Sequence, residues 1–365
     1  MYLSNLILKN FRNYKNLEIG FHEKLNVFVG ENAQGKTNVL ESIFFSSFLK
    51  SHRTNKNFNL IKFEEEDSEI NLSGKRENLK CFEVGLKLNS RSSKKDLFLN
   101  GIRIVKSSDF IGYIKVVMFS PEDLKIVKES PAIRRKFLDM NLSQIDNKYL
   151  RALINYNKVI KYKNSLLKKD KIDLSLLDVY DEQLSLYSSV IMRKRFNYLK
   201  ALNFFSQSIH EKISKSSEKI GIDYNTFLDI DKFNLSEDDI KNKIFDILKK
   251  NRKLDLFKKV CSLGIHKDDF NVKLNDHSVI NYSSQGQQRS SVISIKLGVV
   301  EIIKEFLGEY PVLLLDDILS ELDRDRRNFV LNFIENIQTF ITCTELNERV
   351  LSTHKTFNVS NGRIL

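Results

Sequence analysis

The sequence has few cysteines and no long hydrophobic run, and both absences narrow the class of protein. Its three cysteines, Cys81, Cys261 and Cys343, are odd in number and widely spaced, so we expect reduced thiols. No CxxC pair is present, which excludes zinc ribbons and thioredoxin-like redox sites. No stretch approaches the roughly 20 apolar residues of a membrane span. The first residues carry neither a basic segment nor a small-residue cleavage site. We therefore expect no signal peptide, no membrane partner and a cytoplasmic location.

Glycine and proline are both absent from residues 132–220, a stretch of 89 residues. Because these are the strongest breakers of helices, their absence beside periodic apolar positions predicts consecutive helices. The charged run 168–171 is expected to connect two of them, and residues 221–260 to continue mostly as helix.

The remainder of the 365 residues alternates strand and helix patterns, as expected of an α/β chain of about two domains. Asn100-Gly101 lies between two apolar runs and predicts a hairpin, because both residues tolerate positive φ. Residues 287–307 have the apolar periodicity of a helix. Further strands are predicted at 25–29, 69–72, 82–88, 271–274, 278–282, 311–315 and 340–344.

The net charge of +12 is unevenly distributed and indicates a polyanionic partner such as DNA. Residues 101–200 hold 20 basic and 11 acidic side chains, whereas residues 301–365 hold 7 and 11. Lys outnumbers Arg 42 to 17, so an AT-rich coding bias is the alternative explanation. The basic cluster Arg134, Arg135 and Lys136 is a candidate for contacts with DNA phosphates, or else an ordinary solvated helix face.

Residues 30–37, GENAQGKT, fit the phosphate-binding loop pattern GxxxxGK[ST] between a predicted strand and a predicted helix. Gly30 and Gly35 allow a tight loop whose backbone N–H groups face phosphate oxygens, and the helix N-terminus adds a favourable dipole. Lys36 then reaches the β- and γ-phosphates of ATP, and Thr37 offers its hydroxyl to Mg²⁺. The alternative is an ordinary turn between strand and helix. The predicted ATP-binding residues are Gly30, Glu31, Asn32, Ala33, Gln34, Gly35, Lys36 and Thr37.

The run VLLLDD, residues 312–317, supplies a second part of this site. A buried strand would deliver Asp316 to the Mg²⁺ already expected at Thr37, and Asp317 would orient or deprotonate the attacking water. Lys36, Asp316 and Asp317 are therefore the predicted catalytic residues. A buried strand that simply ends at the surface is the alternative.

Residues 283–289, SSQGQQR, open the helix that leads to that strand, and predict a second anion-binding helix N-terminus. An ordinary helix cap is the alternative, since Ser is a favoured cap residue.

These three motifs, in this order, resemble those of the ATP-binding-cassette ATPases. That resemblance implies that Ser284, Gly286 and Gln287 form a signature loop, which caps the nucleotide of a partner subunit. Three positions depart from the pattern: Gln285 replaces a Gly, Asp317 replaces a Glu, and Thr344 lies where a switch His is expected. The latter two departures favour slow hydrolysis.

The resemblance narrows to the RecF family of bacterial DNA replication and repair proteins, which are related to the heads of SMC and Rad50 proteins. It is carried by NFRNY (10–14), the loop 30–43, FSPEDL (119–124), SPAIRRKFLD (130–139), GIHKDD (264–269), SSQGQQR and LLLDDILSELD (313–323). Ile265 departs from the family, which usually has Pro before the His. The resemblance implies binding at single-strand gaps and duplex junctions, and cooperation with RecR, and through it RecO, to load RecA.

The predicted fold is therefore an α/β head of the P-loop ATP-binding-cassette type with an inserted α-helical lobe. We expect the head to comprise residues 1–125 and 285–365, and the lobe residues 126–284. The expected activity is that of a slow, DNA-stimulated ATPase, which acts as an ATP-dependent homodimer on DNA in repair, replication restart and the SOS response. The alternatives are an SMC-like head that organises chromosomes and, less favoured, the ATPase subunit of a transporter.

Overall fold

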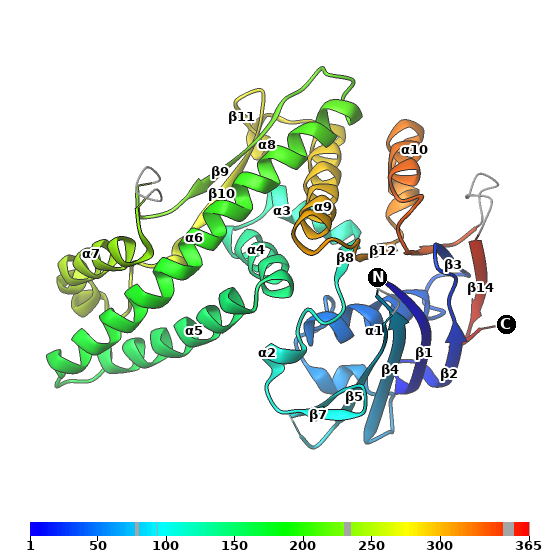
Figure 1. Cartoon of the computed structure of the whole chain (residues 1–365), viewed down its shortest axis with the longest axis horizontal. Helices are drawn as coiled ribbons and strands as arrows, with labels where there is room; N and C mark the ends of the chain where they lie inside the picture. The colour runs from blue at the N-terminus through cyan, green and yellow to red at the C-terminus, as the bar shows by residue number, and fades with distance from the viewer. Residues whose placement is uncertain (77–79, 93, 230–234, 346–353, 365) are drawn as a thin grey trace. The chain divides into compact units, whose positions relative to one another are not determined.

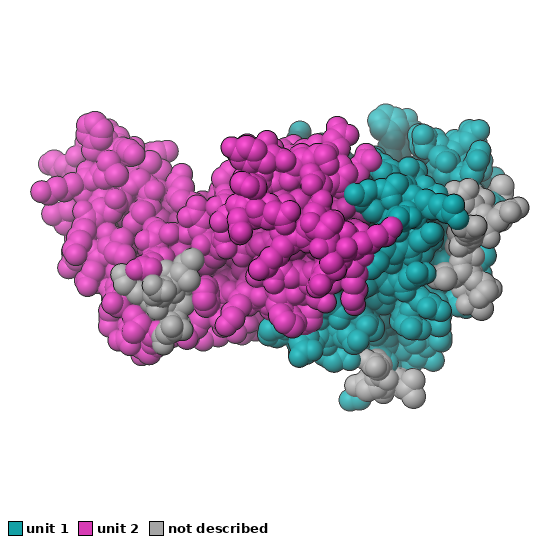
Figure 2. All heavy atoms as spheres, turned by 90° about the horizontal axis from the view of Figure 1, so that it is seen from above, with its two compact units in different colours: residues 1–123, 299–365 teal, residues 124–298 magenta. Residues whose placement is uncertain are grey.

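The computed structural model spans residues 1–365 and describes all of them except 77–79, 93, 230–234, 346–353 and 365. The chain forms two compact units, which Figure 2 colours separately. Unit 1 comprises residues 1–123 and 299–365, and unit 2 comprises residues 124–298. The division into domains at 125/126 and 284/285 stays a prediction. None of the described helices combines the length and the hydropathy that a membrane crossing needs.

Unit 1 contains an antiparallel sheet of six strands, in the order β2-β1-β4-β5-β6-β7 (Figure 1). Apolar and polar positions alternate along its long strands, so one face is buried and the other is exposed to solvent. Asn100 and Gly101 have φ values of 50° and 78° and form the predicted hairpin turn. The strands are β1 (Tyr2–Phe11), β2 (Tyr14–Gly20), β4 (Asp67–Lys75), β5 (Cys81–Asn89), β6 (Lys95–Leu99) and β7 (Ile102–Ile104).

A second sheet of six strands, in the order β15-β14-β3-β13-β12-β8, is parallel except for β15. Strands β3, β8, β12 and β13 are mainly apolar and buried, as expected of a parallel sheet, whereas β14 is largely polar. Helix α1 (Lys36–Phe48) is buried nearly all round because it contacts strands of both sheets. The strands are β3 (Leu25–Val29), β8 (Val116–Phe119), β12 (Val312–Asp316), β13 (Thr339–Cys343), β14 (His354–Ser360) and β15 (Arg363–Ile364). Short helices and α10 complete unit 1: η1 (Asn57–Leu60), α2 (Ser107–Phe110), η5 (Ile318–Glu321) and α10 (Arg324–Phe333).

Unit 2 is mainly helical, and its longest helix, α6 (Leu174–Ile213), has 40 residues, or about 60 Å. Both α5 (Asn147–Leu167) and α7 (Glu237–Lys258) pack along it. A small antiparallel sheet contains β9 (Ile220–Asn225), β10 (Asp269–Leu274) and β11 (His277–Ser278). The other elements are α3 (Lys125–Lys128), α4 (Pro131–Ile145), η4 (Ile265–Lys267), α8 (Val279–Tyr282), η2 (Pro121–Leu124) and α9 (Gln285–Leu307), of which the last two continue into unit 1.

Buried ion pairs join the three long helices of unit 2. The Lys163 ammonium on α5 lies 2.8 Å from carboxylate oxygens of both Asp181 on α6 and Asp255 on α7, and its side chain is fully buried. Arg252 on α7 adds a 2.8 Å contact with Asp181. Removing one partner would leave buried charge unpaired, so we expect this cluster to fix the packing of the helices.

Most of the predicted elements are confirmed, and two segments differ. Residues 221–225 belong to strand β9 instead of a helix, because Ile220, Ile222 and Tyr224 alternate on the buried face against β10. The strand predicted at 278–282 ends at Ser278, and residues 279–282 form the short helix α8.

Candidate nucleotide site

The phosphate-binding loop connects β3 to α1, and both of its glycines are required because a larger side chain would clash. A Cβ at Gly30 would lie 2.3 Å from the carbonyl oxygen of Val359 on the neighbouring strand β14. Gly35 has φ 120°, and a Cβ there would lie 2.6 Å from the Nδ2 atom of Asn13. The tight loop predicted from the motif is therefore imposed by close approach as well as by backbone freedom.

Lys36, the first residue of α1, turns its side chain back over the loop. Its Nζ donates hydrogen bonds to the carbonyl oxygens of Gly30 at 2.5 Å and Glu31 at 2.9 Å. The side chain thus already points across the concave side of the loop. Gly35 caps the N-terminus of α1 and has no side chain to occupy the free N–H groups of the first turn. Loop and helix together form a site suited to an anion.

Two hairpin turns hold the predicted ATP-binding loop in place through hydrogen bonds to Gln34. The sequence did not predict these contacts. Asn13, in the β1–β2 turn, donates from Nδ2 to the Gln34 carbonyl at 2.9 Å. In the β14–β15 turn, Asn361 N–H donates to Gln34 Oε1 at 2.7 Å, and Gly362 N–H to the Gln34 carbonyl at 3.1 Å. Gln34 is therefore bound through both its carbonyl and its side-chain amide, although its partners lie 21 and more than 300 residues away. The NFRNY motif was the only sequence signal for this contact.

Arg12, in the same turn as Asn13, binds a carboxylate inside α1. Its guanidinium contacts both oxygens of Glu41, at 2.8 and 2.6 Å, and Ser51 donates to the same carboxylate. Burial opposes ionisation of Glu41, but the hydrogen bonds from Arg12 and Ser51 outweigh it and lower the pKa of that carboxyl. This pair fastens α1 to the edge of the antiparallel sheet.

Asp316 and Thr37 come together as predicted, although 279 residues separate them in sequence. Thr37 Oγ1 donates to Asp316 Oδ1 at 2.8 Å. The parallel order β3-β13-β12 places the ends of these strands at one edge of the sheet, where the loop begins. Burial raises the pKa of Asp316, and the negative charge of Asp317 adds to that rise. A divalent cation at this carboxylate would offset both effects.

Thr342, on β13, joins the two aspartates and is a residue that sequence reasoning missed. Its hydroxyl donates to Asp316 Oδ1 at 2.9 Å and accepts from the Asp317 N–H at 2.9 Å. Asp317 adopts a left-handed conformation with φ 52°, which turns the chain sharply after β12. The signal for Thr342 was its register opposite Asp316, which only the pairing of β12 with β13 reveals.

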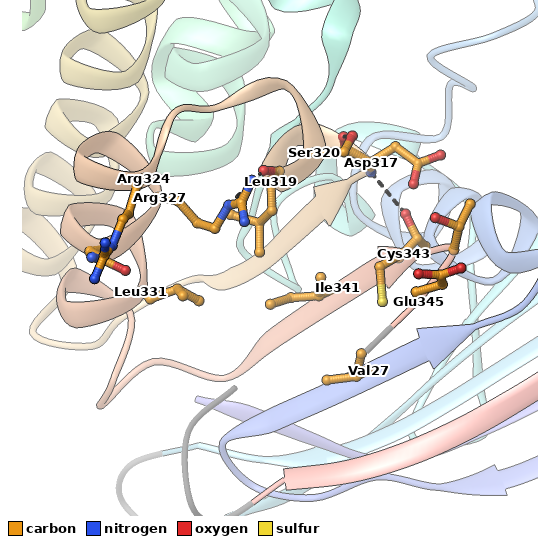
Figure 3. Close-up of a pocket in the computed structure, with 13 residues that line it drawn as sticks. Val27, Asp317, Leu319, Ser320, Arg324, Arg327, Leu331, Ile341, Cys343 and Glu345 are labelled. Carbon is orange, nitrogen blue, oxygen red and sulfur yellow. Dashed lines mark hydrogen bonds between the residues drawn. The ribbon is translucent and has the colours of Figure 1, made fainter. Parts of the chain in front are cut away.

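A hollow of about 440 Å³ lies beside Asp317 in unit 1. Figure 3 shows Asp317 and Cys343 at one end of it and Arg324, on α10, at the other. Thr344, at the position expected for a switch His, also lines this hollow. Burial raises the pKa of the Cys343 thiol, which favours the unreactive neutral form.

The residues of the predicted signature loop lie in unit 2 and form a capping box at the start of α9. Ser284 Oγ accepts from the Gln287 N–H at 3.3 Å, and Gln287 Oε1 accepts from the Ser284 N–H at 2.7 Å. Gly286 lies between them in the first turn. The helix-cap interpretation of this sequence is thus confirmed, and the loop's role toward a nucleotide stays a prediction.

The predicted DNA-contacting cluster on α4 is divided by the fold. Arg134 is buried and makes a bidentate pair with Asp269, at 2.7 and 2.8 Å, so its guanidinium faces the interior of unit 2. Arg135 donates to the Asp268 carbonyl at 2.7 Å. Only Lys136 is exposed. Arg134 and Arg135 are engaged by Asp269 in β10 and by Asp268 in the turn before it. The sequence spacing could not indicate these contacts.

The fold is that of the ATPase heads of SMC proteins. The head domain of an SMC protein solved with the C-winged helix domain of ScpA superposes with a TM-score of 0.59 at 16% identity, over 100% of this chain and 96% of that one. At that identity the likeness concerns the fold alone.

Comparisons with known proteins narrow the class. The model of the RecF/RecN/SMC N terminal domain matches residues 2–362. The DNA replication and repair protein RecF of Clostridium perfringens is 46% identical over 369 residues, which cover 100% of this chain and 99% of that protein. A solved structure described as recombination mediator protein RecF with ATP, in the RecFOR pathway, has a TM-score of 0.92 at 36% identity, over 100% of this chain and 98% of that one. The chain belongs to the RecF family.

Proposed function

We propose that this chain is an ATP-switched DNA-binding protein of recombinational repair and replication restart. The observation that carries the proposal is the joint geometry of the loop, Lys36, Thr37 and Asp316 in a member of the RecF family. The relatives are DNA replication and repair proteins by name, and one solved relative is described with ATP.

The loop would bind the triphosphate of ATP. Lys36 would exchange the carbonyls of Gly30 and Glu31 for the β- and γ-phosphate oxygens, since its ammonium already reaches across the loop. A hollow of about 820 Å³ on the side of Arg12 and Asn38 would take the base and the ribose. Asn38, on α1, and Asn13 both line this hollow, so it adjoins the loop.

Thr37 and Asp316 fit a Mg²⁺ ion, because hydroxyl and carboxylate oxygens are its usual protein ligands and phosphate oxygens and water supply the rest. The ion would neutralise phosphate charge. Asp317 would orient or deprotonate the attacking water as a predicted catalytic residue, with its position set by Thr342. Its carboxylate is one methylene shorter than the Glu of the resembling ATPases, and Thr344 replaces the switch His. We therefore propose slow hydrolysis, stimulated by DNA, that acts as a release switch.

The signature loop would act on a second copy of the chain. Its position at the N-terminus of the 23-residue helix α9 makes it attractive to an anion, and Ser284 is exposed there. Ser284 and Gly286 would cap the nucleotide bound by the partner head. The active form would therefore be a homodimer that assembles only with ATP.

DNA would bind along the outer face of α5. Residues 147–169 include seven Lys or Arg and no Asp or Glu. Lys158 and Lys161 are exposed, and Lys158 lies 5.8 Å from the ring centre of the half-exposed Tyr162. Lys163 is buried against Asp181 and Asp255, and Lys148 lies 3.3 Å from Glu237, so neither is available to DNA. The exposed basic side chains of this stretch, which suit the phosphate backbone of a duplex, are Arg151, Lys158, Lys161, Lys168 and Lys169. From membership of the RecF family we propose the partners of this chain. They are gapped DNA, duplex junctions and RecR, and through RecR also RecO and RecA.

The dimerisation step can be tested with Ser284→Arg, which fills the exposed cap with a bulky side chain. Sedimentation velocity should show the wild type dimerising with Mg-ATP and the variant staying monomeric, with at most a twofold change in ATP affinity. Lys36→Ala, which lacks the phosphate-binding ammonium, should lose ATP binding and dimerisation together. If Ser284→Arg dimerises normally with ATP, the proposed capping across subunits is wrong.

A further inference from the structure

Gln287 in the capping box of α9 has a second partner outside it. Its Nε2 donates to Glu218 Oε1 at 2.8 Å, while its Oε1 accepts from the Ser284 N–H at 2.7 Å. Glu218 is only 19% exposed and lies in the connection between α6 and β9, 69 residues before Gln287. The motif and the comparisons assign it no role.

The carboxylate of Glu218 determines which way the Gln287 amide faces. A carboxylate only accepts hydrogen bonds, so the NH₂ end of the amide must point toward Glu218 and the oxygen toward Ser284. In the reverse orientation two oxygens would meet at Glu218 and two N–H groups at Ser284. Glu218 thus favours the one orientation in which the capping box closes.

The second oxygen of the same carboxylate is bound to the core of unit 2. The Nε2 atom of His210, on α6, lies 3.1 Å from Glu218 Oε2, and the side chain of His210 is fully buried. The Nδ1 atom of His210 lies 3.0 Å from Ser294 Oγ, about two turns further along α9 than Gln287. Glu218 is therefore held in place by a buried side chain and does not depend on the exposed loop for its own position.

We propose that Glu218 is the positioning residue of the signature loop. It orients Gln287, which fixes the backbone and hydroxyl of Ser284 at the N-terminus of α9. On this proposal Gln287 acts through the cap, since both ends of its amide are engaged within unit 2. This inference rests on the proposed capping of a nucleotide bound by the partner, and it names the residue that positions the signature loop for that contact.

The test compares Glu218→Ala with Glu211→Ala, which removes the same charge from an exposed site at the end of α6. Sedimentation with Mg-ATP should show dimerisation about tenfold weaker for Glu218→Ala, as expected for loss of a charge-assisted hydrogen bond. Affinity for Mg-ATP at low protein concentration should stay within twofold, because the phosphate-binding loop lies in unit 1. Glu211→Ala should match the wild type. Glu218→Gln has one acceptor oxygen for two donors, so it should fall between.

A double-mutant cycle separates positioning from general destabilisation. If Glu218 acts through Gln287, adding Glu218→Ala to Gln287→Ala should weaken dimerisation no further. A full additional loss, or wild-type dimerisation of Glu218→Ala, overturns the proposal.

Hydrogen exchange of residues 283–290 gives a readout that does not need dimers. Glu218→Ala should exchange faster there than the wild type and Glu211→Ala, in the free chain. If the wild type fails to dimerise with ATP, the proposed function fails, and the exchange rates still decide the role of Glu218. Unchanged exchange contradicts it.

Discussion

At the residue scale, His266 is buried in unit 2 as a neutral ring with one defined tautomer. Its Nε2 lies 3.1 Å from the Cys261 carbonyl, which only accepts, so Nε2 carries the proton and Nδ1 accepts from Tyr156 at 2.7 Å. Burial, helped by the charges of Lys267 and Arg135, lowers the pKa of His266 to about 4. The ring therefore resists protonation while the chain is folded, and it serves packing in the GIHKDD turn.

This predicts a specific pH dependence of stability. The unfolded chain takes up a proton on this residue near pH 6.5 and the folded chain only near pH 4, so stability falls as the pH drops through that window. Between pH 7.5 and pH 5, the wild type should lose about 2 kcal/mol more unfolding free energy than His266→Gln. Urea unfolding of both proteins at the two pH values measures this difference in unfolding free energy. Equal losses in the two proteins would show that His266 is not buried as a neutral ring.

The residues that sequence predicted well are those in contiguous motifs. Lys36 and Thr37 belong to one eight-residue loop, so their spacing alone indicates their chemistry. Thr342 and Glu218 act through partners 26 and 69 residues away, and no local pattern marks them. Arg134 was misleading for the same reason, because its partner Asp269 is 135 residues distant.

At the scale of elements, α5 carries the sharpest prediction about DNA. Replacing Lys158 and Lys161 with Glu would remove two of the proposed phosphate contacts and add repulsion. We expect duplex affinity to fall at least about tenfold near 100 mM salt, and the dependence of log affinity on log salt to weaken by about two. Fluorescence anisotropy on a duplex across a salt series measures both quantities.

A matched double variant on α7 controls for net charge. Lys250 and Lys253 are exposed, and their replacement by Glu changes the charge by the same amount. This control should bind DNA within about twofold of the wild type. Equal weakening in the two variants would mean that total charge, and not the face of α5, determines binding.

The apolar strands that precede the phosphate-binding loop and Asp317 were predicted, as were the long helices, whereas several other strands were missed. The apolar runs at β3 and β12, and the absence of Gly and Pro from residues 132–220, were sufficient for strands and helices there. Strands β1 and β14 were missed although they flank the loop through the turns at Asn13 and Asn361. Strand β9 was missed because its alternation is short and lies after a long helical region.

At the scale of the whole molecule, both ends of the chain build unit 1. Strand β3 and the phosphate-binding loop come from the N-terminal part, and Asp316, Thr342 and the turn at Asn361 from the C-terminal part. On the proposed capping, the signature loop of one copy would contact ATP bound by unit 1 of a second copy. Nucleotide, dimer and DNA are therefore expected to be coupled.

The most direct test of this coupling is the anisotropy of a labelled gapped duplex, titrated with the wild-type chain with and without Mg-ATP across a salt series. The account predicts tighter binding with Mg-ATP, at least about tenfold, and a steep loss of affinity as salt rises. Binding that is indifferent to ATP at every salt concentration would contradict the account, because the nucleotide site would then be uncoupled from DNA.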